Sequence, residues 1–238
     1  MNTIEKKRKR KNSKKAAELF RRSRWLVDVI CRYKKISFEE INMEWKISRL
    51  NDDKEDIPLR TFHEHKKAVK VILDIDIKCE KDGFKYYIEN PDDMMKDAVG
   101  DWMQYALLSK NQKCETEIKK PRKSNKTSTE RLFLRYAWLV AVIYSYRNDD
   151  GISFSEIKQK WGDSILNDDE DDIPSSTFNE HKKAVNAMFE IDIICNKRNG
   201  NKYYIEYPED MMKDKVRNWM LYALFSKNLK CENAKMDM

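Results

Sequence analysis

An internal duplication constrains the fold of this chain more than any other feature of the sequence. The phrase TFHEHKKAV at residues 61–69 returns as TFNEHKKAV at 177–185, 116 residues later. The similarity extends far beyond this phrase, since LFRRSRWLVDVI at 19–30 matches LFLRYAWLVAVI at 132–143. Repeats of about 20–50 residues build solenoids, whereas a unit of about 100 residues is the size of a small domain. The sequence therefore predicts two domains of the same fold in tandem.

The duplication divides the chain into five predicted segments. The first domain covers residues 17–114 and the second covers 131–232. Residues 115–130 between them hold almost no apolar side chain, and we expect a flexible, basic linker there. A basic disordered tail is predicted over residues 1–16, and a short tail over 233–238.

The positive charge of the chain belongs to its N-terminal tail. Residues 1–15 hold eight Lys or Arg and one acid, which gives +7, the formal net charge of the whole chain. The remainder of the chain is therefore formally neutral. A basic run of this kind attracts anions, and nucleic acid most often, or serves as a nuclear-localisation segment. A solubilising tail without a partner is the alternative.

Composition disfavours several classes of protein. Five glycines leave little room for phosphate-binding loops, and no apolar run approaches the roughly 18 residues of a membrane helix. The N-terminus lacks the apolar segment of a signal peptide. The five cysteines include no CxxC pair, so we interpret them as reduced thiols of a cytoplasmic protein without a zinc site. No triad or paired-carboxylate arrangement recurs, so we expect no enzyme, no cofactor and no metal.

Each repeat predicts three helices, a hairpin and a last helix. Apolar side chains at helical spacing predict the first three helices of repeat one at residues 17–33, 37–46 and 58–73. Two strands, IDIKCE and FKYYIE, follow and are joined by Lys81-Asp82-Gly83, with Asn199-Gly200 at the equivalent place. Both turns tolerate positive φ, as tight hairpins require. A last helix is expected to begin at Pro91, a residue favoured in the first turn.

This order is typical of a winged helix-turn-helix, and four segments carry a resemblance to a known family. ISFEEI, DIPLRTF, HKKA and YYIENPDDM resemble the N-terminal domain of bacterial WYL-domain transcriptional regulators, which are similar to DeoR-type repressors. The resemblance covers nearly all of each repeat and implies DNA binding. The regulators continue into a ligand-sensing WYL domain, whereas this chain continues into a second repeat, so ligand sensing is not implied. The expected fold class is mainly α with small β wings (α+β), in two tandem winged helix-turn-helix domains.

The third helix of repeat one divides into an apolar side and a charged side at 100° per residue. The apolar side is formed by Phe62, His65, Ala68, Val69, Ile72 and Leu73. In a helix-turn-helix the solvent face of this helix enters the major groove, where Arg and Lys read guanine and Glu accepts from cytosine. The candidate DNA-binding residues are Arg60, Thr61, His63, Glu64, Lys66, Lys67 and Lys70, with Lys81 and Lys85 at the wing. An ordinary solvated charged face is the alternative.

Repeat two offers a less basic candidate face. The equivalent residues are Ser176, Thr177, Asn179, Lys182, Lys183 and Asn186, with Lys197, Arg198 and Lys202 at the wing. Because Arg60 and Lys70 are replaced by Ser and Asn, we expect repeat two to contribute less electrostatic affinity. Asn can still pair with adenine. Alternatively, repeat two keeps the fold for pairing with repeat one and does not touch DNA.

The start of the third helix and the roles of its histidines are open. Thr61 and Glu64 fit a capping box, which would leave Arg60 outside the helix, whereas the resemblance favours a start near Pro58. His63 and His65 point about 160° apart, so they cannot share a metal ion. We interpret His65, and its equivalent in repeat two, as packed and hydrogen-bonded, and His63 as pointing outward.

The leading hypothesis is a DNA-binding transcriptional regulator of the bacterial cytoplasm, associated with the nucleoid. Its two domains would form an intramolecular pseudo-dimer on double-stranded DNA. One alternative is a plasmid-type replication initiator, which also uses two winged helices. The other is a protein–protein interaction module, which the neutral body favours. A protein partner or a homodimer is possible, and no membrane association is expected.

Overall fold

The computed structural model describes residues 3–91, 101–107, 128–167, 172–198, 200–211 and 213–228. Within these residues the fold is mainly helical with two short antiparallel hairpins, which is the α+β class that the sequence predicts. Repeat one contains α1 (Thr3–Tyr33), α2 (Phe38–Ile47), α3 (Leu59–Leu73), β1 (Lys78–Cys79), β2 (Tyr86–Tyr87) and α5 (Asp101–Ala106). Repeat two contains α6 (Ser128–Ser145), α7 (Phe154–Asp163), α8 (Ser175–Phe189), β3 (Ile193–Asn196), β4 (Lys202–Ile205), the 3-10 helix η1 (Pro208–Met211) and α9 (Lys215–Asn228).

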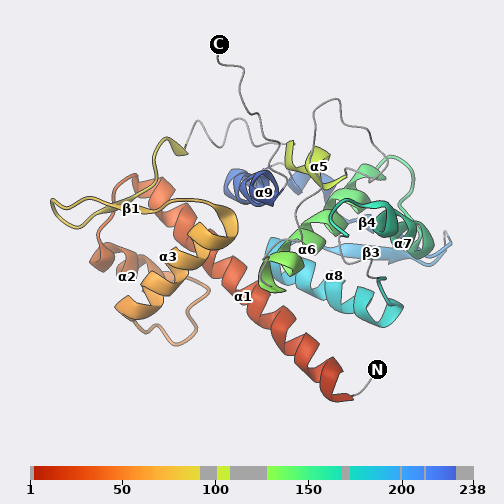
Figure 1. Cartoon of the computed structure of the whole chain (residues 1–238), viewed down its shortest axis with the longest axis horizontal. Helices are drawn as coiled ribbons and strands as arrows, with labels where there is room; N and C mark the ends of the chain where they lie inside the picture. The colour runs from red at the N-terminus through yellow and green to blue at the C-terminus, as the bar shows by residue number, and fades with distance from the viewer. Residues whose placement is uncertain are drawn as a thin grey trace, which may run out of the picture.

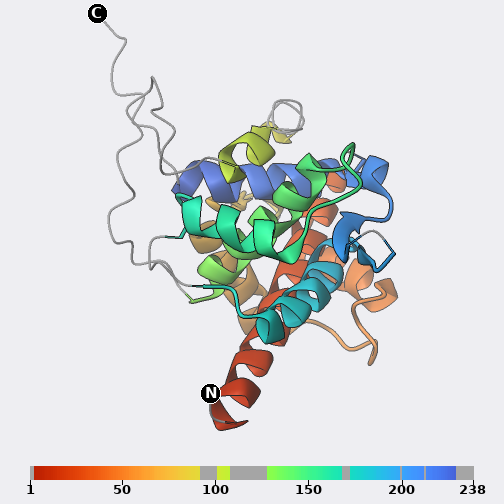
Figure 2. The same ribbon diagram turned by 90° about the vertical axis from the view of Figure 1, so that its right-hand side faces the viewer.

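Helix α1 begins at Thr3, whereas the sequence predicted a disordered tail over residues 1–16. The segment holds no Pro or Gly and is rich in Lys and Arg, which are good helix formers, so the helix continues into it without a break. Ala16 and Ala17 are already buried in the core. The N-terminal turns of α1 project beyond the rest of the fold in two views at right angles (Figure 1 and Figure 2). The basic run therefore extends the first helix away from the body.

Capping boxes start the second helix of each repeat. The Ser37 hydroxyl accepts from the Glu40 N–H at 3.2 Å, and the Glu40 carboxylate accepts from the Ser37 N–H at 2.8 Å. Ser153 and Glu156 make the same reciprocal pair at the start of α7. Two N–H groups that would have no partner inside each helix are satisfied in this way.

The third helix begins at Leu59, after Pro58 at its N-cap position, so the predicted start near Pro58 is confirmed. The alternative capping box at Thr61 and Glu64 is wrong, because no side chain caps α3 and both residues lie inside the helix. Pro58 has φ −58° and ψ 138°, and its ring fixes the entry into the first turn.

The hairpins pair fewer residues than the predicted strands contain. Each of β1 and β2 has two residues, and each of β3 and β4 has four. The segment before the second helix adds a bridge to each hairpin, from Ile36 to Tyr86 and from Ile152 to Tyr203. The predicted turn glycine has positive φ in the first hairpin, at +80° for Gly83. A small sheet therefore lies beside the helices of each repeat.

The two repeats share one hydrophobic core. Phe20 of α1 packs edge-on against Phe133 of α6 and Phe189 of α8, and each pair of ring centroids is 5.1 Å apart. Trp102 of α5 is fully buried and donates its indole N–H to the Asn218 side chain of α9 at 3.2 Å. Figure 1 shows α2, α3 and β1 on one side and α7, α8 and β4 on the other, with α1 crossing between them. The buried side chains form a single cluster across both repeats.

One arginine reinforces the contact between the repeats, and a second joins two helices within repeat two. Arg24 of α1 forms ion pairs with Glu190, at 3.3 Å, and with Asp214, both of repeat two. Arg217 is buried and donates to the carbonyl oxygen of Phe189, the last residue of α8, at 2.8 Å. Cations are favourable at this end of a helix because the last carbonyl groups lack partners within it.

Parts of the predicted organisation lie outside the described residues. These are residues 92–100 of the predicted last helix of repeat one, most of the linker at 115–130, and the tail at 233–238. The end of the predicted linker, Ser128 to Glu130, forms the first turn of α6 instead, with Glu130 buried. An acidic residue suits that position because the N-terminus of a helix is electropositive. The two domain boundaries stay a prediction.

Three cysteines, Cys31, Cys79 and Cys195, are free thiols in the structure. Across the described ranges, no group of three or more His, Cys, Asp or Glu side chains has the arrangement to hold a metal ion. None of the helices in that part of the chain is long and apolar enough to cross a membrane.

Candidate nucleic-acid interface

The structure confirms how the sequence divides α3 between core and solvent. Phe62, Val69, Ile72 and Leu73 are buried, and His65 and Ala68 are half-buried. The outward residues Arg60, His63, Glu64, Lys67 and Lys70 are exposed, and Thr61 and Lys66 are half-buried. Phe62 holds the helix in place, since its ring lies 4.7 Å from that of Tyr86 on β2 and 5.2 Å from that of Phe38 on α2. The hairpin is thereby fixed beside the charged face.

Ion pairs along α3 hold two of its cations only weakly. Arg60 lies 3.1 Å from Glu64, and Lys70 lies 3.1 Å from Asp74, each pair one turn apart and exposed. Exposed pairs of this kind contribute about 0–1 kcal/mol, so both cations can exchange these partners for a phosphate or a base edge. Lys67 is exposed and forms no ion pair within the described ranges. It is the outward cation of α3 that needs no rearrangement to meet an anion.

A lysine at the edge of each third helix lies over an aromatic ring of the hairpin. Lys66 Nζ is 5.5 Å from the centroid of Tyr86, and Lys182 Nζ is 4.9 Å from that of Tyr203. Cation–π contacts of this length orient a lysine without neutralising it. Each ammonium is therefore placed between helix and hairpin, where a backbone phosphate could contact both elements.

The face of α8 is exposed but carries less charge. Ser176, Asn179 and Lys183 are exposed, and Lys183 lies 3.8 Å from Glu180. The Asn186 amide donates to Asp192 at 2.6 Å, so it is already engaged within the fold. Thr177 and Lys182 are half-buried. Asn179 is exposed on the outward face of α8, and within the described residues its amide makes no hydrogen bond to another side chain.

The hairpins carry the predicted cations and one residue that the sequence analysis missed. Lys81 and Lys85 are exposed in the first hairpin. In the second, Lys197 and Arg198 are exposed and Lys202 is half-buried. Phe84 lies between Lys81 and Lys85 and is 74% exposed. The alignment of the two hairpins could have indicated that this position is exposed, because the polar residue Asn201 occupies it in repeat two.

His65 and its equivalent in repeat two, His181, are packing residues, as predicted. His181 is buried, and its ring meets that of Tyr136 edge-on at 5.3 Å. Burial, with a contribution from the positive charge of Arg135, lowers the pKa of His181 to about 3. The predicted hydrogen bond is not found at its Nδ1, which has no partner within the described part of the chain. Burial also lowers the pKa of the half-buried His65.

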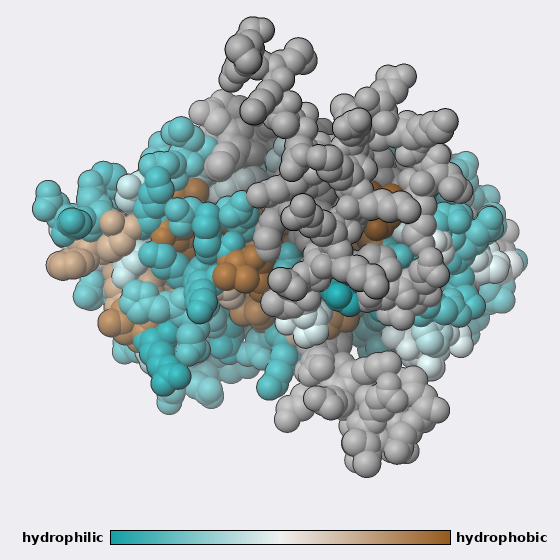
Figure 3. All heavy atoms as spheres, viewed as in Figure 1, coloured by the Kyte–Doolittle hydropathy of each residue, from teal (hydrophilic) through white to brown (hydrophobic). Residues whose placement is uncertain are grey.

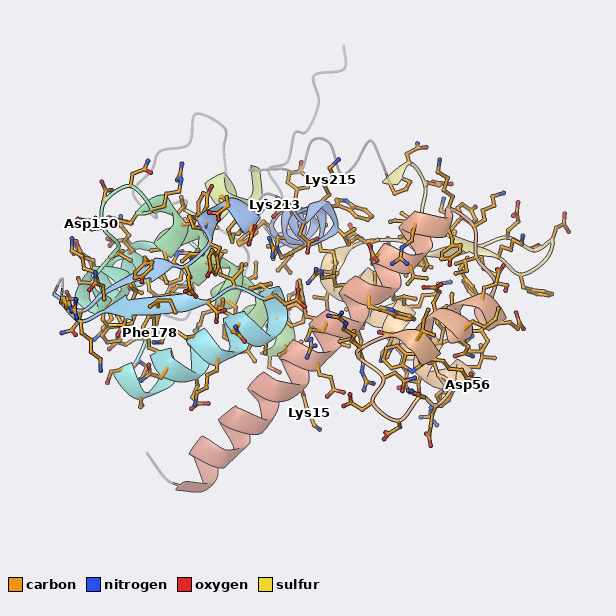
Figure 4. All side chains as sticks on the ribbon, turned by 180° about the vertical axis from the view of Figure 1, so that it is seen from behind. Lys15, Asp56, Asp150, Phe178, Lys213 and Lys215 are labelled. Atoms are coloured by element: carbon orange, nitrogen blue, oxygen red, sulfur yellow. The ribbon has the colours of Figure 1, made fainter. Side chains whose placement is uncertain are left out.

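Other lysines mark the two opposite sides of the molecule. Figure 4 places Lys15 on the projecting part of α1, and Lys213 and Lys215 on the far side, near α9. All three side chains are exposed. Lys213 pairs with Asp210 at 2.5 Å. Because Lys215 is exposed and lies on the side of the molecule opposite Lys15, it is a surface cation distant from the projecting basic helix.

Comparison with known proteins adds no family assignment. A scan against protein-family models, a search of curated proteins and a search of solved structures each found no match to this chain. The geometry of the two exposed helix faces is therefore the basis for a functional proposal.

Proposed function

We propose that the protein is a DNA-binding transcriptional regulator with two winged helix-turn-helix units that form an intramolecular pseudo-dimer on duplex DNA. One observation carries the proposal. The outward faces of α3 and α8 stand at equivalent positions of two repeats that share a single core. Two equivalent helix faces on one body are what helix-turn-helix dimers present to successive turns of DNA, about 34 Å apart.

The order of elements supports the winged-helix assignment. In each repeat three helices are followed by a hairpin, and the segment between the first two helices bridges to the second hairpin strand. Phe62 touches Tyr86, and Phe178 touches Tyr203 at 4.8 Å, so the hairpin is fixed to the third helix in both repeats. A helix placed in the major groove would therefore carry its hairpin onto the neighbouring backbone.

The contact between Phe20 and Phe133 supports the pseudo-dimer. These residues hold the same position in the two repeats, and their rings are 5.1 Å apart. In a two-fold symmetric dimer a residue near the axis meets its own equivalent in the partner. A contact between these equivalent residues is therefore what a pseudo-dimer would place near its axis. Because their outward residues differ, the pseudo-dimer would recognise an asymmetric site.

The projecting basic part of α1 would add affinity that does not depend on sequence. Residues 1–15 carry eight cations, and this end of α1 stands clear of the core (Figure 1). Each phosphate that the protein neutralises releases counterions, which makes binding depend steeply on salt. We expect this segment to contact backbone phosphates beside the site.

The test compares Lys67→Ala with Lys215→Ala, which removes the same charge on the side of α9. A duplex is selected from a random-sequence pool with the full chain, and its affinity is measured by fluorescence anisotropy at several salt concentrations. We expect Lys67→Ala to weaken binding and to reduce the slope of log K against log salt by about one. Lys215→Ala should leave both unchanged.

The outcomes of this test separate two errors. Equal slopes for wild type and Lys67→Ala would show that α3 does not face DNA. Absence of binding by the wild-type chain at low salt would overturn the DNA-binding proposal itself.

A protein-interaction module is the second candidate, favoured by an apolar pair on α2. Met43 is 61% exposed and Ile47 is 79% exposed, one helical turn apart. Repeat two carries Gln159 and Asp163 at these positions, so the apolar pair belongs to repeat one alone.

Replacing the six basic residues at 6–11 by Gln distinguishes the DNA-binding regulator from the interaction module. If this change abolishes DNA binding at every salt concentration, the folded body does not bind DNA and the interaction module is the better proposal.

A further inference from the structure

The tip of the first hairpin presents a large apolar side chain to solvent. Phe84 follows the turn glycine between β1 and β2 and is 74% exposed. Figure 3 shows apolar surface at this outer end of repeat one, against a mainly hydrophilic surround. Exposed phenylalanine gains nothing for the fold, since its apolar area stays in water. Single exposed apolar residues are common on protein surfaces, so the exposure of Phe84 gains weight only beside a second observation.

The backbone at this position makes phenylalanine more unusual. Phe84 has φ +48°, in the left-handed region, where a bulky residue is an outlier. The equivalent residue of repeat two, Asn201, has φ +56°, and Asn is enriched in this conformation. Both residues follow a turn glycine with positive φ, Gly83 or Gly200. The two hairpins thus share positive φ at both of these positions, and only repeat two fills the second position with a residue that suits it.

The surroundings of Phe84 are charged rather than apolar. Lys81 and Lys85 flank it, and Asp82 is the acid between them. The acids at the base of the hairpin are paired, Glu80 with Lys35 at 2.9 Å and Glu89 with Lys78 at 2.7 Å. A protein-docking surface needs a contiguous apolar patch of several hundred Å². A single aromatic ring between two lysines suits duplex DNA, because the lysines can contact phosphates while the ring contacts the stacked bases.

We infer that Phe84 is an apolar wedge that enters the minor groove beside the α3 site and opens one base-pair step of the bound duplex. The inference rests on the proposed function and deepens it. Lys81 and Lys85 would contact the phosphates on either side of the step. Architectural proteins insert Phe, Leu or Met in this way and kink DNA by roughly 20–90°. Repeat two, with Asn201 at its tip, lacks the wedge, so the duplex bends at the repeat-one half of the site.

Phe84→Asn is the decisive variant because it copies repeat two. It removes a side chain that is 74% exposed, and it places at φ +48° a residue that tolerates this region, so we expect the fold to be retained. Met43→Gln is the matched control, since it exchanges another exposed apolar residue of repeat one for the residue of repeat two. Asn201→Phe is the reciprocal variant, which adds a ring to the second hairpin.

The experiment uses the full chain and a selected duplex of about 30 base pairs. Energy transfer between dyes on the two ends reports bending, and 2-aminopurine at successive positions reports unstacking. For the wild type we expect a bend and a fluorescence increase confined to one step in the repeat-one half-site. Phe84→Asn should abolish both and weaken binding about tenfold, the change expected when one base–aromatic contact is lost. Met43→Gln should behave as wild type, and Asn201→Phe should add a second unstacked step.

Three other results would overturn the inference, and each differs from failure of the proposed function. If the wild type binds without bending or unstacking, Phe84 is not a wedge and DNA binding stands. The same holds if Phe84→Asn bends the duplex as the wild type does. If the free protein is a dimer that Phe84→Asn converts to a monomer in light scattering, the residue serves self-association. If the wild type binds no duplex at all, the proposed function fails and the wedge fails with it.

Discussion

His181 is a basic group that the fold keeps neutral. Its ring is buried against Tyr136, and its pKa is lowered from 6.5 to about 3. The unfolded chain therefore takes up a proton below pH 6.5, whereas the folded protein does not do so until about pH 3. Because the unfolded state binds more protons in this window, the free energy of unfolding falls as the pH falls.

We predict that His181 alone removes about 2 kcal/mol of stability between pH 7 and pH 5. His181→Gln, which is uncharged at both pH values, should flatten the pH dependence of the urea midpoint in this range. His65→Gln is the control, because His65 is only half-buried and its lowered pKa should contribute less. A wild-type pH slope in His181→Gln would contradict the buried, neutral state.

The two capping boxes lead to a prediction at the scale of the helix. Ser37→Ala should cost about 1 kcal/mol of unfolding free energy, because an N–H of the first turn of α2 loses its acceptor. Thr61→Ala should change it by no more than about 0.5 kcal/mol, because Thr61 lies inside α3 and caps nothing. Urea unfolding of both variants measures the difference. A larger cost for Thr61→Ala than for Ser37→Ala would show that α3 begins at Thr61.

The sequence predicted helices and helix faces better than caps and strands. The division of α3 into buried and exposed residues follows from a period of 3.6 alone, and the structure agrees at Phe62 and at Lys67. The start of α3 had two solutions because Thr61 and Glu64 match a capping box that does not form. In the first hairpin only Lys78 and Cys79 pair with the opposite strand, at Tyr87 and Tyr86. The predicted strands were longer because the flanking Ile77 and Ile88 are also apolar, and both are buried.

The exposed charged face of α3 was predictable in position but not in detail. The pairing of Arg60 with Glu64 follows from their spacing along the helix, but its geometry does not. The exposure of Phe84 had no signal within its own repeat, because Phe84 opens the predicted strand FKYYIE and phenylalanine is enriched in strands. Its significance emerges only from the comparison with Asn201 at the same turn.

At the scale of the whole molecule, the shared core was hidden in the sequence. Phe20 has the spacing of an ordinary core residue of its own repeat, and a pattern of apolar residues does not specify its partners. In the structure its ring meets Phe133 and Phe189 of repeat two. The stability of each repeat therefore depends on the other.

We predict one cooperative unfolding transition for the full chain, with tryptophan fluorescence and circular dichroism coinciding. Each repeat carries three of the six tryptophans, so fluorescence reports on both. Phe20→Ala should lower the free energy of unfolding by about 3–5 kcal/mol and shift both signals together, because it opens a cavity between the repeats. Leu107→Ala, at a partly exposed position, is the control. Two separate transitions would show that the repeats fold independently.

The ion pair between Arg24 and Glu190 joins residues 166 positions apart, and this separation has a consequence for synthesis. A ribosome adds about 5–20 residues per second, so α1 would wait roughly 10–30 seconds for its partners on α8 to emerge. Until then the apolar stripe around Phe20 has no surface of repeat two to cover it. The charged turns that precede the stripe in α1 would keep the nascent helix hydrated during this interval, before any ligand is met.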